Sequence, residues 1–213
     1  MNLLGPTISH LSELLGRSPT GSIKAQYNKG KRSPLGDSYF RRIEAVEYTL
    51  KTDDGRATWL LNEADVVIVG VSRTGKTPLS VVLCQTMGLK VANIPLVLEC
   101  PPPSELLEKG NIDPRRIFCL TINPNELKKI RTTRLEGSVR DTEEKLDLTE
   151  DGSRRSNYAD RNYLLRDLKS ARELAVANGW TEVDVTGRAV EETSSIISEM
   201  LNERFENYNG PSY

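Results

Sequence analysis

The residues best suited to do chemistry lie in one glycine-rich stretch, residues 70–77. The stretch matches the pattern G-x-x-x-x-G-K-[ST] and consists of Gly70, Val71, Ser72, Arg73, Thr74, Gly75, Lys76 and Thr77. A chain of this length and average composition matches that pattern by chance on the order of one per cent of the time. A β-branched run precedes the stretch and a helical pattern follows it, which is the strand–loop–helix setting the pattern requires. We therefore predict that all eight residues bind nucleotide or phosphate.

Each position of this stretch has a chemical reason. Gly70 and Gly75 allow backbone angles that a Cβ would forbid, so successive N–H groups can turn inward around an anion. The N-terminus of the following helix adds to this cradle. Lys76 is expected to reach the terminal phosphates and Arg73 to add a second positive charge, so we predict these two residues to be catalytic. The hydroxyl of Thr77 is placed to ligate Mg²⁺.

An acidic partner for the metal is less clear from the sequence. Asp184 ends an apolar strand and Asp65 precedes one, but each also fits a structural or capping role. Asn123 ends another strand, although an amide can serve neither as a base nor as a charged metal ligand. Three residues at the start of the last predicted helix could approach a nucleotide or belong to a solvated first turn that the helix dipole favours: Arg188, Glu191 and Glu192.

The segments that must position this stretch alternate between strand and helix patterns. Strands are predicted at 66–69, 90–98, 116–122 and 182–186. Helices are predicted at 39–50, 77–88, 104–110, 123–134, 157–178 and 189–206, with Pro78 and Pro124 in first turns and Asn123 as an N-cap. The alternation predicts an α/β fold that contains a P-loop and a mostly parallel sheet flanked by helices.

The chain divides by composition into a main domain and flanking segments. Residues 39–206 are predicted to form the P-loop α/β phosphotransferase domain, and 135–156 to be a charged insertion in it. Residues 1–15 suggest a short leucine-bearing helix, and 16–38 a flexible linker rich in Gly, Ser and Pro. Residues 207–213 suggest a tail. A leucine-bearing helix with nothing local to pack on predicts association, and we expect a homodimer.

Composition excludes several classes of protein. The 213 residues carry a net charge of -1, which argues against a general nucleic-acid binder. The basic run at 29–32 could contact phosphate or remain solvated. No apolar run approaches ~18 residues, so no transmembrane helix and no membrane partner are expected. The three cysteines are scattered along the chain, which suggests reduced thiols. With a single histidine, we expect no structural zinc site.

Several stretches in order resemble the pyruvate, phosphate dikinase regulatory protein family, whose bacterial relatives act on phosphoenolpyruvate synthase. They are YFRRIEAVEYTL (39–50), ADVVIVG (64–70), GVSRTGKTPLS (70–80), KVANIPLV (90–97), IFCLTINPNELKKIRTTR (117–134), RSNYA (155–159), EVDVTGRAVEET (182–193) and, more weakly, LLGPTISHLSELLGR (3–17). Members of that family carry a further α/β domain before the stretch that corresponds to residues 3–17. The resemblance therefore implies that residues 1–15 are the remnant helix of an N-terminal domain that is absent here.

The resemblance also implies a bifunctional enzyme. Such proteins phosphorylate a threonine of the dikinase with ADP as donor, which makes them serine/threonine-protein kinases. They remove the phosphate with inorganic phosphate and release pyrophosphate. The expected cofactors are thus ADP (or ATP), Mg²⁺ and inorganic phosphate, and the expected partner is pyruvate, phosphate dikinase or phosphoenolpyruvate synthase. The expected compartment is the cytoplasm, or the plastid stroma if the natural N-terminus lies further upstream.

Two other functions fit the same residues. One is a P-loop kinase of a small molecule, because fold and loop do not fix the acceptor. The other is a truncated, non-catalytic module that binds nucleotide or a partner only. An assay with the dikinase, ADP and Mg²⁺ separates these two functions from the regulatory enzyme.

Overall fold

The computed structural model describes residues 10, 13–14, 37–108, 110–140 and 161–205. The elements that position the site belong to the unit that runs from Ser38 to Tyr213. Most of the segments predicted at 1–15 and 16–38 lie outside the described residues. The tail at 207–213 and the greater part of the insertion at 135–156 lie outside them as well.

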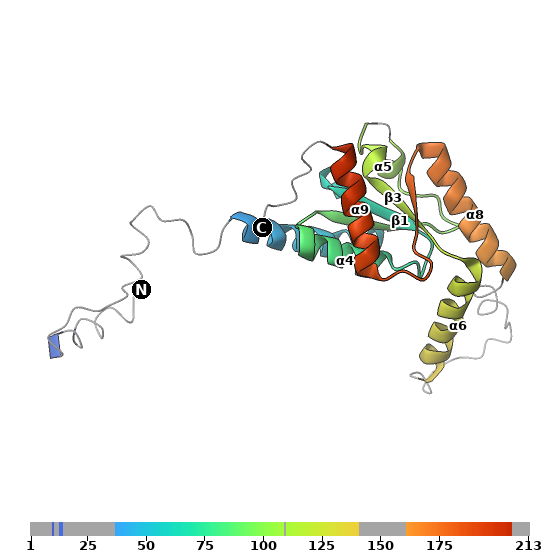
Figure 1. The fold of residues 1–213 in the computed structure, drawn as a ribbon, viewed down its shortest axis with the longest axis horizontal. Helices are drawn as coiled ribbons and strands as arrows, with labels where there is room; N and C mark the ends of the chain where they lie inside the picture. Colours follow the sequence, from blue (N-terminus) through green and yellow to red (C-terminus); the bar gives the residue numbers. More distant parts are fainter. Residues whose placement is uncertain (1–9, 11–12, 15–36, 109, 141–160, 206–213) are drawn as a thin grey trace. The chain divides into compact units, whose positions relative to one another are not determined.

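Four short strands form one parallel sheet at the centre of this unit (Figure 1). They are β1 (Val66–Gly70), β2 (Val91–Pro95), β3 (Ile117–Thr121) and β4 (Thr181–Asp184), in the order β2-β1-β3-β4. Val67 of β1 pairs with Ala92 of β2 on one side and with Ile117 of β3 on the other. Every residue of β1 is buried, as expected for a β-branched strand covered on both faces. The predicted α/β fold with a parallel sheet is confirmed.

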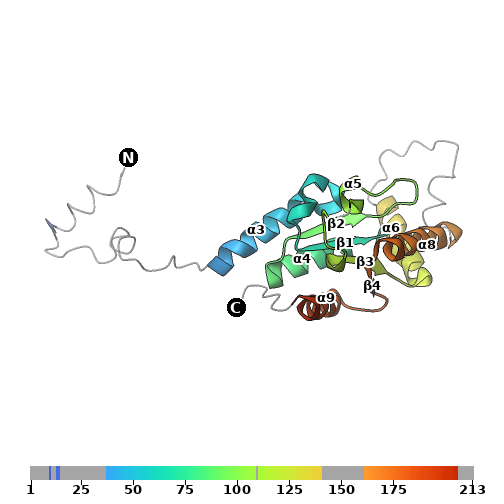
Figure 2. The same cartoon turned by 90° about the horizontal axis from the view of Figure 1, so that it is seen from above.

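Helices cover both faces of the sheet (Figure 2). Helices α4 (Lys76–Met87) and α9 (Val190–Arg204) pack on one face through Leu79, Leu83, Ile197 and Leu201, which meet Ile68 and Phe118 of the strands. On the other face lie α5 (Ser104–Leu107), α6 (Pro124–Arg140) and α8 (Arg161–Asn178). Burial of these apolar side chains on two faces is the main stabilising contribution to the fold.

Helix α3 (Asp37–Lys51) lies beside the edge strand β2. Its last turn and the residue that follows the helix each supply a hydroxyl to that strand. The backbone N–H of Val91 donates to Thr49 Oγ1 over 3.2 Å, and Thr52 Oγ1 donates to the carbonyl of Val91 over 3.3 Å. These bonds satisfy backbone groups at the beginning of an edge strand, which would otherwise be an open pairing surface.

The order of the strands places a crevice beside β1. The chain leaves β1 for β2 on one side and then crosses to β3 on the other side of β1. In open parallel sheets, the carboxyl ends of the strands at such a reversal are where ligands bind. The 70–77 loop begins at the carboxyl end of β1, so the fold brings the chemistry-bearing residues to this crevice.

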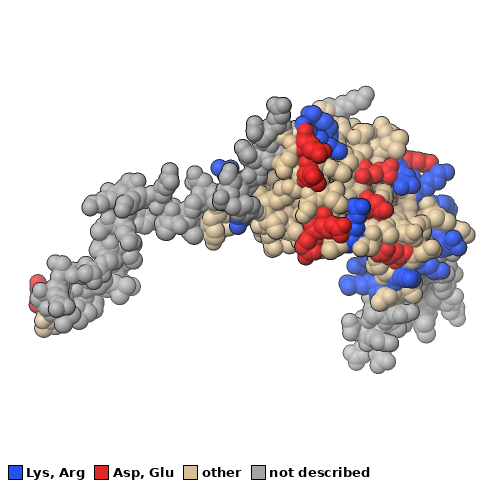
Figure 3. Space-filling model, viewed as in Figure 1, with Lys and Arg blue, Asp and Glu red and all other residues tan. Residues whose placement is uncertain are grey.

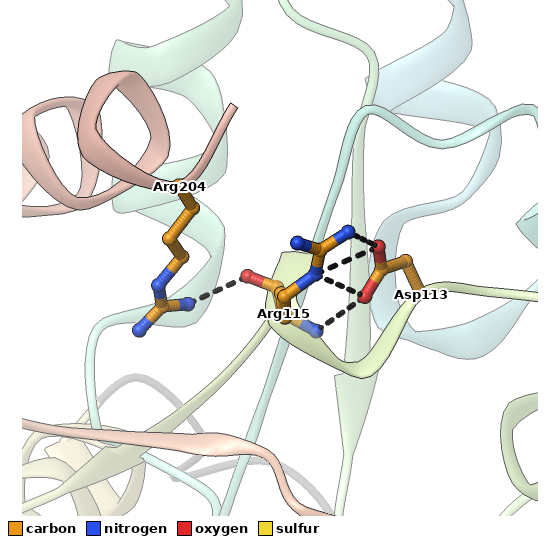
Figure 4. Close-up of polar contacts among 3 residues, drawn as sticks. All are labelled: Asp113, Arg115 and Arg204. Carbon is orange, nitrogen blue, oxygen red and sulfur yellow. Dashed lines mark hydrogen bonds and ion pairs between the residues drawn. The ribbon is translucent and has the colours of Figure 1, made fainter. Parts of the chain in front are cut away.

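The end of α9 is anchored to the 3₁₀ turn η3 (Pro114–Arg116), which precedes β3 (Figure 4). Arg204 donates to the carbonyl of Arg115 over 2.6 Å, and the Arg115 guanidinium pairs with Asp113 over 2.6 Å. Arg115 also lies 4.7 Å from the ring centroid of Phe205. Although individually weak at an exposed surface, these contacts fix the position at which α9 leaves the sheet.

Several local features differ from the sequence-based expectations. Strand β2 ends at Pro95 and not at residue 98, and α5 ends at Leu107 and not at residue 110. A 3₁₀ helix, η2 (Thr58–Glu63), buries Leu61 in a region where no element was predicted. Helix α6 continues to Arg140, past the predicted end at residue 134 and into the range expected as an insertion. The charged composition after residue 134 favoured an exposed insertion there, and no periodic pattern predicted an element at 58–63.

Charged side chains of both signs are interspersed on the face shown in Figure 3, and basic ones are more frequent toward α6 and α8. Within the part of the chain that the structure describes, no helix is long and apolar enough to span a bilayer.

Candidate functional site

The 70–77 loop connects the buried strand β1 to helix α4. Gly75 has φ 86° and Arg73 has φ 73°, both in the left-handed region. A Cβ on Gly70 would lie 3.0 Å from the carbonyl oxygen of Leu120 in β3, and φ at Gly70 is 150°, which residues with a side chain rarely adopt, so glycine is strongly favoured there. Gly75 is the N-cap of α4 and no side chain caps that helix. The N–H groups of the first turn therefore remain free of any side-chain cap, as an anion site requires.

Lys76 is the first residue of α4 and is folded over the loop. Its Nζ donates to the carbonyl of Val71 over 2.8 Å, and only 7% of the residue is exposed. Thr74 Oγ1 donates to the same carbonyl over 3.0 Å. Burial lowers the pKa of Lys76 to about 8, while nearby Asp54 acts to raise it. An arriving phosphate would offer this ammonium a better partner than a neutral carbonyl.

Arg73 is exposed at the tip of the loop and lines a cavity of about 170 Å³ on the α6 and α9 side. Thr74 and Gly75 line the same cavity, together with Arg188 and the apolar side chains of Ile122 and Val185. Arg188 is therefore close to the loop, as one reading of the sequence suggested. Of the two acids considered with it, Glu191 lines a different hollow, between α4 and α9.

Thr77 meets two side chains from distant parts of the chain. Its Oγ1 donates to Asp53 Oδ1 over 3.1 Å and accepts from Asn93 Nδ2 over 2.9 Å. Asn93 Nδ2 also donates to Asp53 Oδ1 over 2.6 Å. Asp53 comes from the 3₁₀ turn η1 (Asp53–Gly55) and Asn93 from the middle of β2. Carboxylate and hydroxyl oxygens of this kind are ligands that Mg²⁺ accepts, so Thr77 and its surroundings fit the predicted metal.

Behind the loop lies a buried ion pair. Arg131 of α6 and Asp167 of α8 meet over 2.8 Å, with 1% and 6% of their side chains exposed. Arg131 also donates to the carbonyl of Ser72 over 3.2 Å. The pair thus links α6 and α8 to the loop, and Arg131 fixes the backbone carbonyl of Ser72 by a hydrogen bond.

The two strand-associated acids considered from the sequence have structural roles. Asp65 lies at the amino end of β1, opposite the loop, and accepts from the backbone N–H of Lys90 over 2.9 Å. Asp184 ends β4, which β3 separates from β1. It accepts from Thr186 Oγ1 over 2.6 Å, and this contact lowers the pKa of Asp184. Asn123 accepts from the N–H of Asn125 over 2.9 Å, which confirms the predicted N-cap.

Sequence reasoning missed four residues of this site: Asp53, Asn93, Arg131 and Asp167. Asp53, Asp54 and Gly55 form a turn, and nothing local in the sequence shows that this turn lies against Thr77. Asn93 interrupts an otherwise apolar strand and is 1% exposed. An amide within a run of aliphatic residues is the one feature of the sequence that could have indicated a functional residue here.

A parallel sheet whose first strand runs into a glycine-rich loop ending in Lys-Thr, followed by a helix, defines a P-loop α/β protein. A sequence model of the kinase/pyrophosphorylase family matches residues 1–198. The chain belongs to this kinase/pyrophosphorylase family. The family's description implies the use of a nucleotide and of phosphate.

Curated relatives are similar over nearly all of this chain. A putative pyruvate, phosphate dikinase regulatory protein of Sorangium cellulosum is 44% identical over 97% of the chain and 66% of its own length. The chloroplastic pyruvate, phosphate dikinase regulatory protein of Zea mays is 39% identical over 95% of the chain and 44% of its own length. Regulatory protein 1 of Arabidopsis thaliana, also chloroplastic, is 38% identical over 97% and 47% respectively. The chain therefore spans about two thirds or less of the length of these relatives.

Proposed function

We propose that this chain carries the nucleotide-dependent phosphotransferase activity of a regulator of pyruvate, phosphate dikinase or of phosphoenolpyruvate synthase. The single observation that carries the proposal is the 70–77 loop, which has a buried lysine and an uncapped helix N-terminus at the crevice beside β1. The regulatory target is proposed from the relatives' names. The compartment is then that of the target, the cytoplasm or the plastid stroma.

In the kinase direction, ADP is the donor and a threonine hydroxyl of the target is the acceptor. The loop N–H groups hold the β-phosphate, and Lys76 exchanges the Val71 carbonyl for a phosphate oxygen. The bond from the bridging oxygen to the β-phosphorus breaks and a bond to the threonine oxygen forms. AMP leaves, and the threonine hydroxyl gives up its proton to water. Arg73 offsets negative charge from the exposed side of the loop. Positioning and charge stabilisation of this kind account for most of phosphoryl-transfer catalysis.

In the opposite regulatory direction, the same cradle holds inorganic phosphate. An oxygen of that phosphate attacks the phosphorus of the target's phosphothreonine, the threonine oxygen leaves with a proton, and pyrophosphate is released. Both directions therefore use one anion site with different occupants. Thr77 would hold a Mg²⁺ ion, which would supply positive charge to the phosphate oxygens in either direction.

The decisive experiment offers the purified chain ADP and Mg²⁺ with one of three acceptors. The acceptors are pyruvate, phosphate dikinase, phosphoenolpyruvate synthase and a panel of small phosphate acceptors. We expect phosphate on a threonine of one of the two enzymes, and its release as pyrophosphate when inorganic phosphate is added. Transfer to a small molecule alone would make the chain a metabolite kinase. Nucleotide binding without transfer would make it a binding module.

The predicted homodimer belongs to the same proposal. Light scattering at micromolar concentration measures the mass of the particle directly. A mass of two chains agrees with the proposal, and a mass of 23.8 kDa, that of one chain, contradicts the dimer without affecting the phosphotransferase.

A further inference from the structure

We infer that Asp53, Asn93 and Thr77 together form a divalent-cation site, in which Asp53 supplies the negative charge and Asn93 an additional oxygen. This inference rests on the proposed function, because the ion would share its coordination with a phosphate held by the 70–77 loop. It assigns the metal a carboxylate from outside the loop and outside the strands.

The first observation is the convergence of three polar side chains from three elements. The three distances between Asn93 Nδ2, Asp53 Oδ1 and Thr77 Oγ1 are 2.6, 2.9 and 3.1 Å. The amide NH₂ lies between a carboxylate and a hydroxyl, and its hydrogens carry the partial positive charge that these two oxygens attract. A small cation would satisfy the same two oxygens with a full charge.

The second observation is independent of the first. Asn93 is 1% exposed, yet its Oδ1 has no hydrogen-bond partner among the described residues. A buried amide oxygen without a partner destabilises a protein, so its presence asks for a reason. The amide has two nearly equivalent orientations about its last torsion. Turning it over brings Oδ1 to the place where Nδ2 now contacts Asp53 and Thr77. A cation there would give the oxygen its partner, while the NH₂ group would take over the buried position that Oδ1 now occupies.

The third observation concerns where an acid is available. The strands that flank β1 carry no acidic residue at their carboxyl ends, because β2 ends in Asn93-Ile94-Pro95 and β3 in Leu120-Thr121. The acid comes instead from η1, which precedes β1 in the chain and lies against β2. Asp53 thus brings a carboxylate to Thr77 in the first turn of α4.

The site has only one carboxylate, which determines how it should behave. Within the described ranges, no group of three or more His, Cys, Asp or Glu residues could hold a metal ion. A cation with one carboxylate, one hydroxyl and one amide needs further ligands, and Mg²⁺ usually completes its six with waters and phosphate oxygens. We therefore expect weak binding of the metal alone and much stronger binding together with ADP.

The first experiment measures binding and not turnover. Electron paramagnetic resonance follows free Mn²⁺, and calorimetry follows ADP with and without Mg²⁺, for the wild-type chain and for Asp53→Asn. The matched control is Glu63→Gln, which removes the same charge from an exposed position in η2. We expect Asp53→Asn to lower the affinity for Mn²⁺ in the presence of ADP by roughly 10–100-fold, in line with the loss of one metal-site partner, and the control to leave it unchanged.

The second experiment uses Asn93→Asp and measures melting temperature, so the metal site can still be tested if Asp53→Asn fails to fold. Without a cation, this variant brings two carboxylates together and should melt below the wild type. Mg²⁺ should raise the melting temperature of this variant by more than KCl of the same ionic strength does. The increase with Mg²⁺ should also exceed the increase seen for the wild type. Recovery that KCl reproduces would overturn the metal site, because a merely structural triad responds to screening alone.

The outcomes of these experiments distinguish failure of the proposed function from failure of the metal site. No binding of ADP with or without Mg²⁺ overturns both the proposed function and the metal site. Binding of ADP that does not depend on Mg²⁺, or whose dependence on Mg²⁺ survives in Asp53→Asn, overturns the metal site and leaves the proposed function standing.

Discussion

The guanidinium of Arg131 donates to the backbone carbonyl of Ser72 across 3.2 Å from beneath the 70–77 loop. The two residues are far apart in the sequence, and Arg131 is held in place by its ion pair with Asp167. A charged side chain at 1% exposure is costly unless it is fully paired. We interpret Arg131 as the residue that positions the loop backbone.

Asp167→Ala should lower the free energy of unfolding by about 3–5 kcal/mol, because it leaves the buried Arg131 charge without its partner. Urea denaturation measures this directly. The double variant Arg131→Met/Asp167→Leu should regain most of that loss, since it removes both charges and fills the space. Its affinity for ADP should still be weaker than that of the wild type, because Ser72 has lost its donor. A double variant with wild-type ADP affinity would show that Arg131 has no positioning role.

The two loop glycines should differ in their tolerance of alanine. Gly70→Ala places a Cβ 3.0 Å from the Leu120 carbonyl, so strand or loop must move. Gly75→Ala meets no atom within 4 Å and costs only the strain of φ 86°, about 1–2 kcal/mol. We expect Gly70→Ala to be the more destabilised of the two in chemical denaturation. The reverse order would mean that the close approach of β1 to β3 is not as described.

The three cysteines should react unequally with a thiol reagent. Cys100 is exposed, whereas Cys84 and Cys119 are buried. Burial also raises the pKa of Cys119 to about 12, so its reactive thiolate is scarce at neutral pH. Native protein should label rapidly at Cys100 alone, and mass spectrometry of the labelled peptides identifies the site. Rapid labelling of Cys119 would indicate that the core beneath α8 opens.

Strand and helix periodicity predicted the order of the elements because those patterns are local. The run from Val66 to Val69 and the glycine-lysine-threonine ending of the loop carried enough information to place a P-loop on a parallel sheet. The N-cap at Asn123 was predictable for the same reason, because capping involves residues two positions apart.

The remaining parts of the site depend on contacts between distant residues. Asp53 meets Asn93 and Thr77 only because η1 folds back along β2, and Arg131 meets Asp167 only because α6 packs on α8. From the local sequence alone, a polar residue is predicted to lie at the solvent-exposed surface, because its distant partner cannot be identified. The strand acids Asp65 and Asp184 fit an acidic metal ligand by their local sequence alone. In the fold, Asp65 lies at the opposite end of β1 from the loop, and Asp184 accepts a hydrogen bond from Thr186.

Transfer of the β-phosphoryl group of labelled ADP to the dikinase can be compared between the wild-type chain and Lys76→Ala. Lys76 is a predicted phosphate contact that rests on a backbone carbonyl, so its removal should leave the melting curve nearly unchanged. Losing one charge-assisted phosphate contact should cost roughly 2–4 kcal/mol in the transition state, or about 10²–10³ in rate. We expect label on a dikinase threonine with the wild type and its near-complete loss with Lys76→Ala. Equal transfer by both proteins would contradict this expectation.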